Sequence, residues 1–140
     1  MGEKSVALDV EIPSDVKYIE KVIELAALRC RELHVPARKC SLNVRVALAE
    51  ALSNAILRGN ATGDGKRVRV RATVSDDEVV FDVFDDGPGF DLAAPRADPT
   101  TPENRLKEEG RGLYLMGRLM DRVERFTSEG NVVRLTLRRK

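Results

Sequence analysis

The chain has 140 residues, of which 24 are Lys or Arg and 23 are Asp or Glu, with a formal net charge of +1. This length favours one domain over residues 1–140, with a core large enough to need no metal or disulfide. The near balance of charge gives no electrostatic case for nucleic acid, whose binding needs clustered positive charge. The basic end Arg138-Arg139-Lys140 is therefore interpreted as a solvated tail.

The two cysteines, Cys30 and Cys40, and the single histidine, His34, lack the spacing of a metal-binding set. His34 falls near an expected helix end, where a surface or capping position is predicted. The sequence has no signal-peptide pattern and no apolar run near 18 residues. These features predict a cytoplasmic protein that does not bind a membrane.

The first elements in chain order are a strand and two helices. Residues 6–12 have strand character that Pro13 ends, and Ser14 or Asp15 can cap a helix running to about Leu33. A second helix is predicted over about 37–58. Its apolar residues gather on one side at 100° per residue, and Glu50 and Asn54 lie roughly opposite, one turn apart.

The second half of the chain reads mainly as strands. Residues 67–74 alternate between apolar and polar, whereas 79–84 is apolar on both faces and is expected to be more central. A long proline-containing loop over 91–109, a helix over about 112–120 and a hairpin of 122–127 with 132–137 follow. The order β-α-α-β-β-loop-α-β-β predicts an α+β fold, a two-layer α/β sandwich with a mostly antiparallel sheet and helices on one face.

A carboxylate and two glycines mark the end of the second of these strands. Alternation places Asp85 on the side of Phe81 and Val83, so its carboxylate needs a donor such as the exocyclic amine of adenine. Gly87 and Gly89 would let the backbone pass close to a flat ring. The competing interpretation is an ordinary strand-ending turn.

A second glycine pair, in Gly110-Arg111-Gly112, is expected just before the next helix. Amides at a helix N-terminus bind anions, and glycines let phosphates approach. Arg111 either adds positive charge there or faces outward. The segment is not a Walker P-loop, because no G-K-[ST] follows, and a flexible helix start explains it equally well.

The acid and amide on the second helix can supply metal and proton chemistry. Mg²⁺ takes few protein oxygens, and the carboxamide of Asn54 can provide one. Glu50, one turn earlier, can orient or deprotonate an attacking hydroxyl. Taken alone, the pair is better explained by a solvated polar helix face.

Together these motifs resemble the N-box, G1 and G2 elements of the GHKL ATPase superfamily, whose domain is the Bergerat or HATPase fold. The small size and the sequences of 50–56, 83–91, 98–104 and 110–116 are similar to the bacterial anti-sigma-factor serine/threonine kinases. The resemblance covers nearly the whole chain and is most specific over 46–121.

The resemblance implies a role for each motif. ATP and Mg²⁺ would be bound, with Asn54 on the metal, Asp85 on adenine N6, Gly87 and Gly89 along the base, and the 110–112 segment at the phosphates beneath a lid. Glu50 would be the catalytic base. The implied partners are a sigma factor or equivalent regulator and a small STAS-type anti-sigma-factor antagonist, phosphorylated on Ser or Thr. The first strand and helix could also offer a homodimer surface, as in relatives.

Two positions depart from this branch. Relatives often carry His at the position of Arg58, and Thr near Gly130-Asn131, where it helps bind adenine through water. Kinase activity is therefore less secure than nucleotide binding. The alternatives are a non-catalytic ATP-sensing module that sequesters a protein partner, and a structural domain with degenerate motifs.

Overall fold

The computed structural model describes residues 4–59, 66–86, 108–127 and 130–140, which form a five-stranded sheet in the order β1-β2-β3-β5-β4. Every neighbouring pair is antiparallel. The strands are β1 (Ser5–Pro13), β2 (Arg67–Val74), β3 (Glu78–Asp85), β4 (Arg122–Thr127) and β5 (Asn131–Arg138).

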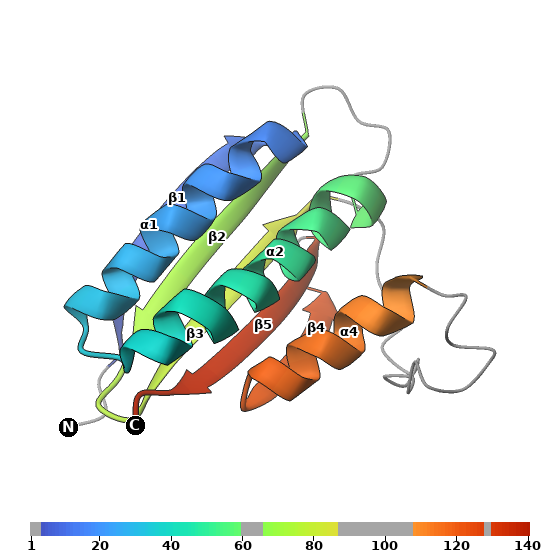
Figure 1. Cartoon of the computed structure of the whole chain (residues 1–140). Helices are drawn as coiled ribbons and strands as arrows, with labels where there is room; N and C mark the ends of the chain where they lie inside the picture. Colours follow the sequence, from blue (N-terminus) through green and yellow to red (C-terminus); the bar gives the residue numbers. More distant parts are fainter. Residues whose placement is uncertain (1–3, 60–65, 87–107, 128–129) are drawn as a thin grey trace.

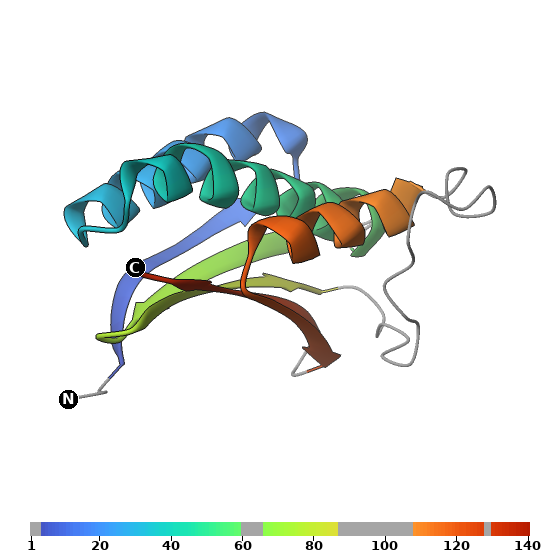
Figure 2. The ribbon, with the colours of Figure 1, turned by 60° about the horizontal axis from the view of Figure 1, so that its bottom comes forward.

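The helices form a second layer over one face of this sheet (Figure 2). A 3₁₀ turn (Val16–Tyr18) leads into α1 (Ile19–Glu32). Next, α2 (Arg45–Asn54) lies between two π-helical segments, Lys39–Val44 and Ala55–Gly59, and α4 spans Glu108–Leu119. Figure 1 shows α2 between α1 and α4, and it packs against both. The predicted two-layer α+β architecture is confirmed.

The central place of β3 follows from its sequence. Val79, Phe81 and Val83 point into the core under the helices, while Val80 and Asp82 on the other face are also buried. A strand apolar on both sides suits the middle of a sheet. In the sheet, β5 lies between β3 and β4, and Phe81 of β3 pairs with Leu135 of β5. The predicted central position is therefore confirmed.

Local capping chemistry sets both ends of α1. The side chain of Asp15 accepts a hydrogen bond from the Lys17 amide at 3.0 Å, as predicted for a cap. At the other end His34 has φ 62°, the left-handed conformation. Its amide donates to the Arg31 carbonyl and that of Val35 to the Cys30 carbonyl, both at 3.1 Å. This pair of bonds is a Schellman motif, so the predicted capping role of His34 is confirmed.

Two predicted elements differ from the structure in detail. The last helix begins at Glu108, four residues before the predicted start at Gly112. Glu108 and Glu109 favour an earlier start because acidic residues stabilise the positive end of a helix dipole. The second helix follows the predicted range but widens to π-helical turns at both ends of α2. The predicted loop over 91–109 lies mostly outside the described residues.

The core between the two layers is aliphatic. The predicted buried face of α2 is confirmed, and Leu48 and Leu52 are fully buried over the sheet, where Phe81 is the one aromatic among the largest such side chains of the described residues. Burying each leucine contributes about 1.5–3 kcal/mol relative to exposure. None of the helices described is long and apolar enough to cross a bilayer.

Candidate functional site

Four element ends meet at one edge of the molecule, which we call the Asp85 end. They are the C-terminal end of α2 with its π-helical extension, the end of β3, and the starts of β5 and α4 (Figure 1). The π-helical segment Ala55–Gly59 packs against β3, and Asp85 pairs with Asn131 in the β3–β5 register. Three of the predicted motifs therefore lie at the same end of the fold.

Asp85 is buried at the last position of β3, with 4% of its surface exposed. It lies on the helix-facing side with Phe81 and Val83, as alternation predicted. The side-chain amide of Asn131 donates to Asp85 Oδ1, with Nδ2 2.9 Å from the oxygen. A buried carboxylate requires such donors, because an unpaired buried charge is strongly disfavoured.

Gly130, directly before β5, lies against the backbone of Asp85. Gly130 has φ 122°, and a Cβ at this position would stand 2.2 Å from the Asp85 carbonyl oxygen. Only glycine satisfies both the backbone angle and the close approach. Gly130-Asn131 was predicted to depart from relatives, but the contact between Asn131 and Asp85 was not predicted. This contact joins the ends of β3 and β5. The strand order that places these two strands side by side was not predicted.

Glu50 and Asn54 lie on the flank of α2 that faces α4. Asn43 begins this flank, and its Nδ2 donates to the Leu119 carbonyl at the end of α4 at 2.7 Å. Glu50 and Asn54 follow at i+7 and i+11, which places them on the same side of the helix. Both are half-buried. Because Asn43 contacts the end of α4, the two helices run antiparallel, and the C-terminal end of α2 lies toward the start of α4 (Figure 1). Asn54 is the last residue of α2.

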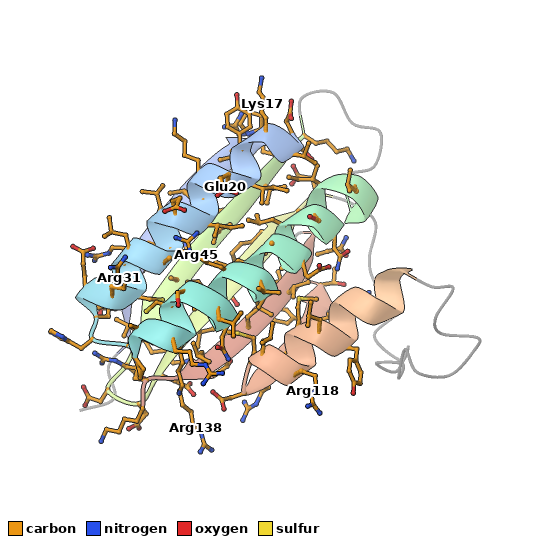
Figure 3. All side chains as sticks on the ribbon, viewed as in Figure 1. Lys17, Glu20, Arg31, Arg45, Arg118 and Arg138 are labelled. Atoms are coloured by element: carbon orange, nitrogen blue, oxygen red, sulfur yellow. The ribbon has the colours of Figure 1, made fainter. Side chains whose placement is uncertain are left out.

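The other flank of α2 is bound to α1 by an ion pair. Arg45 Nη1 lies 2.7 Å from Glu24 Oε1, and Figure 3 shows Arg45 between the two helices. The hydrogen bond from Arg45 holds the pKa of Glu24 below its usual value. Both side chains are partly exposed, so the pair adds little stability. The flank that faces α4 is thus the one that carries the predicted acid and amide.

The second glycine motif forms the first turns of α4. Gly110, Arg111 and Gly112 all lie inside the helix rather than before it, which corrects the predicted placement. The first amides of a helix have no intrahelical acceptor, and Gly110 falls among them, whereas Gly112 is already past this point. The anion site expected from both glycines is thereby restricted to the first turn. Gly87 and Gly89, the other predicted glycines, lie outside the described residues.

The donor set at the Asp85 end suits a nucleotide. A buried acceptor stands at one side, the N-terminal amides of α4, which have no acceptor within the helix, at another, and a carboxamide with a carboxylate on the flank between them. Helix N-termini bind phosphate, and carboxamide oxygens bind Mg²⁺. These groups fit ATP and Mg²⁺ in chemical character, as the resemblance implied.

The fold is that of an ATPase domain. Residues 12–137 match the family described as histidine kinase-like ATPase domain, and the chain belongs to that family. The match covers almost all of the chain. It confirms the fold and family that the motifs predicted.

Named relatives narrow the similarity to one branch. The chain is 31% identical to the serine-protein kinase RsbW of Bacillus pumilus over 97% of its own length and 88% of that protein. It is 33% identical to RsbW of Bacillus subtilis over 67% of this chain and 62% of that one. The anti-sigma F factor of Clostridium beijerinckii is 28% identical, over 70% of this chain and 69% of the relative.

Proposed function

We propose that the chain is an ATP-dependent serine/threonine kinase of the anti-sigma-factor type, which regulates transcription by partner switching. The observation that carries this proposal is the similarity to RsbW over nearly the full length of both chains, within a family of ATPase domains. The chemistry gathered at the Asp85 end supports it. Regulation of a sigma factor implies action in the cytoplasm.

ATP would lie across the Asp85 end. The Asp85 carboxylate would accept a hydrogen bond from adenine N6, with Gly87 and Gly89 along the ring. The amides in the first turn of α4, Gly110 among them, would receive the phosphates, since a helix N-terminus favours negative charge. This arrangement uses the burial of Asp85 and the antiparallel course of α2 and α4.

Asn54 would be the protein ligand of Mg²⁺. The ion, when bound, would neutralise charge developing on the transferred phosphoryl group. Asn54 suits this place because it lies on the α4-facing flank of α2, toward the helix start proposed for the phosphates. We expect Asn54→Ala to remove the magnesium dependence of ATP binding measured by calorimetry. The same dependence in the variant and the parent would contradict this ligand.

Glu50 would act as the general base. The hydroxyl oxygen of a serine or threonine on the antagonist attacks the γ-phosphorus, the bond from that phosphorus to the ADP oxygen breaks, and the hydroxyl proton passes to the Glu50 carboxylate. Glu50 lies one helical turn before Asn54 on the same flank. The base and the metal ligand would thereby share one rigid element.

Two protein partners follow from the relatives' names and the resemblance. A sigma factor or equivalent regulator would be held by the kinase, and a STAS-type antagonist would compete for it and be phosphorylated. A homodimer through β1 and α1 would provide the binding surface. β1 is an edge strand of the sheet, so its outer edge is open to pairing.

Phosphate transfer by the purified chain tests the proposal. The chain is incubated with magnesium, radiolabelled ATP and a candidate STAS-type antagonist, and label on the antagonist is followed. We expect transfer, and a loss of about a hundredfold or more in its rate in Glu50→Gln. Glu124→Gln, an exposed glutamate on β4, is the matched control and should transfer as the parent does.

Two other outcomes have definite meanings. Tight ATP binding with no transfer to any antagonist would favour the non-catalytic sensing module. No rise in melting temperature with millimolar Mg-ATP would favour a structural domain, because a ligand that binds only the folded state must stabilise it.

A further inference from the structure

We propose that Asn43 is a positioning residue for the phosphates of the bound nucleotide, through its hydrogen bond to the far end of α4. The inference rests on the proposed function, since it concerns the nucleotide held at the start of α4. It goes beyond that function by giving a role to a residue that lies outside the predicted motifs, at the opposite end of the helix.

Asn43 binds the C-terminal end of α4 through a short hydrogen bond. Its Nδ2 donates to the Leu119 carbonyl, 2.7 Å away, and the contact is partly buried. Leu119 is the last residue of α4, where backbone carbonyls have no donor within the helix. The side chain of Asn43 therefore acts as a C-terminal cap that another element supplies. It fixes where α4 ends along α2.

The chain next to this bond holds the same end of α4 to the rest of the fold. Met116 and Met120 are 0% and 6% exposed and belong to the core. Directly after the helix, the amide of Asp121 donates to the Thr136 carbonyl of β5 at 2.9 Å. The C-terminal end of α4 is thus tied to the sheet by its own chain, and Asn43 ties it to the helical layer.

A bond at one end of a helix sets the position of the other end. α4 has 12 residues, so its ends are about 17 Å apart at about 1.5 Å per residue. A tilt of about 10° at the anchored end would then move the start of the helix by about 3 Å. Reacting groups misplaced by about 1 Å can already lose about a hundredfold in rate. The start of α4 therefore depends on how firmly its far end is held.

The same hydrogen bond relates α4 to the helix that carries the proposed metal ligand. Asn43 lies in the π-helical segment Lys39–Val44, which continues directly into α2. Asn54 is the last residue of α2, and this end of α2 lies toward the start of α4 (Figure 1). Holding α4 at Asn43 would therefore set the distance between the phosphate-binding amides and the ligand of Mg²⁺.

Calorimetry with Mg-ATP tests the inference on the full chain. Asn43→Leu keeps a side chain of similar size but removes the donor. We expect it to bind Mg-ATP about tenfold more weakly than the parent, because displaced phosphate contacts lose about the energy of one hydrogen bond. Both proteins are compared at a temperature at which circular dichroism shows them fully folded. Lower stability alone then leaves the affinity unchanged.

Lys39→Met is the matched control. Lys39 lies in the same π-helical segment, and its Nζ also donates to backbone carbonyls, but to those of Arg138 and Lys140 at the end of β5. This variant should bind Mg-ATP within about twofold of the parent. Parent affinity in Asn43→Leu, or an equal loss in Lys39→Met, would overturn the inference and leave the proposed function intact. A parent that does not bind Mg-ATP would overturn the proposed function, and the inference with it.

A measurement on the parent covers a variant that fails to fold. The side-chain amide protons of Asn43 are followed by NMR while Mg-ATP is added. We expect their resonances to move, because the phosphates and Asn43 would hold opposite ends of one rigid helix. The backbone amide of Asp77, in the turn between β2 and β3, is the reference and should stay in place. Asn43 resonances as unchanged as this reference would overturn the inference.

Discussion

The two ends of the sheet satisfy their polar groups in different ways. At the Asp85 end, two buried side chains bind each other across β3 and β5, beside a backbone turn that only glycine allows. At the opposite end, which we call the Cys40 end, long charged side chains bind backbone carbonyls. Lys39 Nζ donates to the carbonyls of Arg138 and Lys140 at 2.9 and 2.6 Å.

Arg139 extends the pattern at the Cys40 end. Its guanidinium donates to the Ser75 carbonyl at 2.9 Å and to the Leu33 carbonyl at the end of α1. Carbonyls at a helix C-terminus lack partners, and a cation there is favourable. These contacts hold the C-terminal residues against the rest of the fold. They join cationic side chains to backbone carbonyls, which any residue can supply. At the Asp85 end, by contrast, a buried carboxylate, a buried amide and a positive φ angle together lower the stability of the fold. We infer that these features are kept there because they serve binding.

The largest expected effect comes from removing the close approach at Gly130. Gly130→Ala should lower the free energy of unfolding by about 3 kcal/mol, because the added Cβ meets the Asp85 carbonyl oxygen and φ 122° strains any other residue. Urea denaturation measures it. Asp77→Ala, in the turn at the Cys40 end, should change stability by less than about 0.5 kcal/mol. Equal losses of stability in Gly130→Ala and Asp77→Ala would contradict the difference proposed between the two ends of the sheet.

The next effect concerns the Asp85 carboxylate. Asp85→Asn should weaken ATP binding about ten- to a hundredfold without unfolding the chain. The new amide oxygen can still accept from Asn131, but the group has lost its charge. Calorimetry gives the affinity and circular dichroism the folded state. Asp77→Asn at the other end should bind as the parent does, and unchanged affinity in Asp85→Asn would place adenine elsewhere.

The thiols at the Cys40 end predict a pH effect. Burial raises the pKa of the Cys30 thiol to about 12 from an ordinary 9.0, and the neighbouring Cys40 thiol adds to it. The unfolded chain then loses this proton at lower pH than the folded one. The contribution of the neutral thiol to the free energy of unfolding is therefore complete below about pH 9. Above pH 9 it falls by up to about 1.4 kcal/mol per pH unit.

Replacing the thiol isolates this contribution from other groups that titrate in the same range. Cys30→Ala should show a shallower fall in stability between pH 9 and 10.5 than the parent, in parallel urea denaturations. The same slope in both proteins would mean that Cys30 ionises freely in the folded state.

Most of the fold was predictable because its signals are local. Alternation in 67–74, the two apolar faces of β3 and the Asp15 cap each depend on neighbouring residues, and the structure confirms them. The order of the strands was not predicted, since it depends on long-range pairing. The place of β5 beside β3 therefore had to come from the structure.

The positions of the candidate site residues in the fold were predictable where these residues form motifs on one element. Glu50 and Asn54 are such a pair, and Asp85 was located by alternation within its strand. Asn131 was missed as a donor because its partner lies 46 residues away on another strand. The start of α4 was misplaced because glycine indicates a helix boundary by propensity, whereas the preceding acidic residues allow the helix to begin earlier.

The smallest expected effect is at the C-terminal end of α1. His34→Gly should raise the free energy of unfolding by about 0.5–1 kcal/mol, because glycine adopts φ 62° without strain and the Schellman hydrogen bonds remain. His34→Val should lower it, since a β-branched residue is disfavoured there. Urea denaturation of both variants compares them with the parent. Because this turn lies at the Cys40 end, ATP affinity should be unchanged in His34→Gly, and a loss of affinity would show that the two ends are coupled.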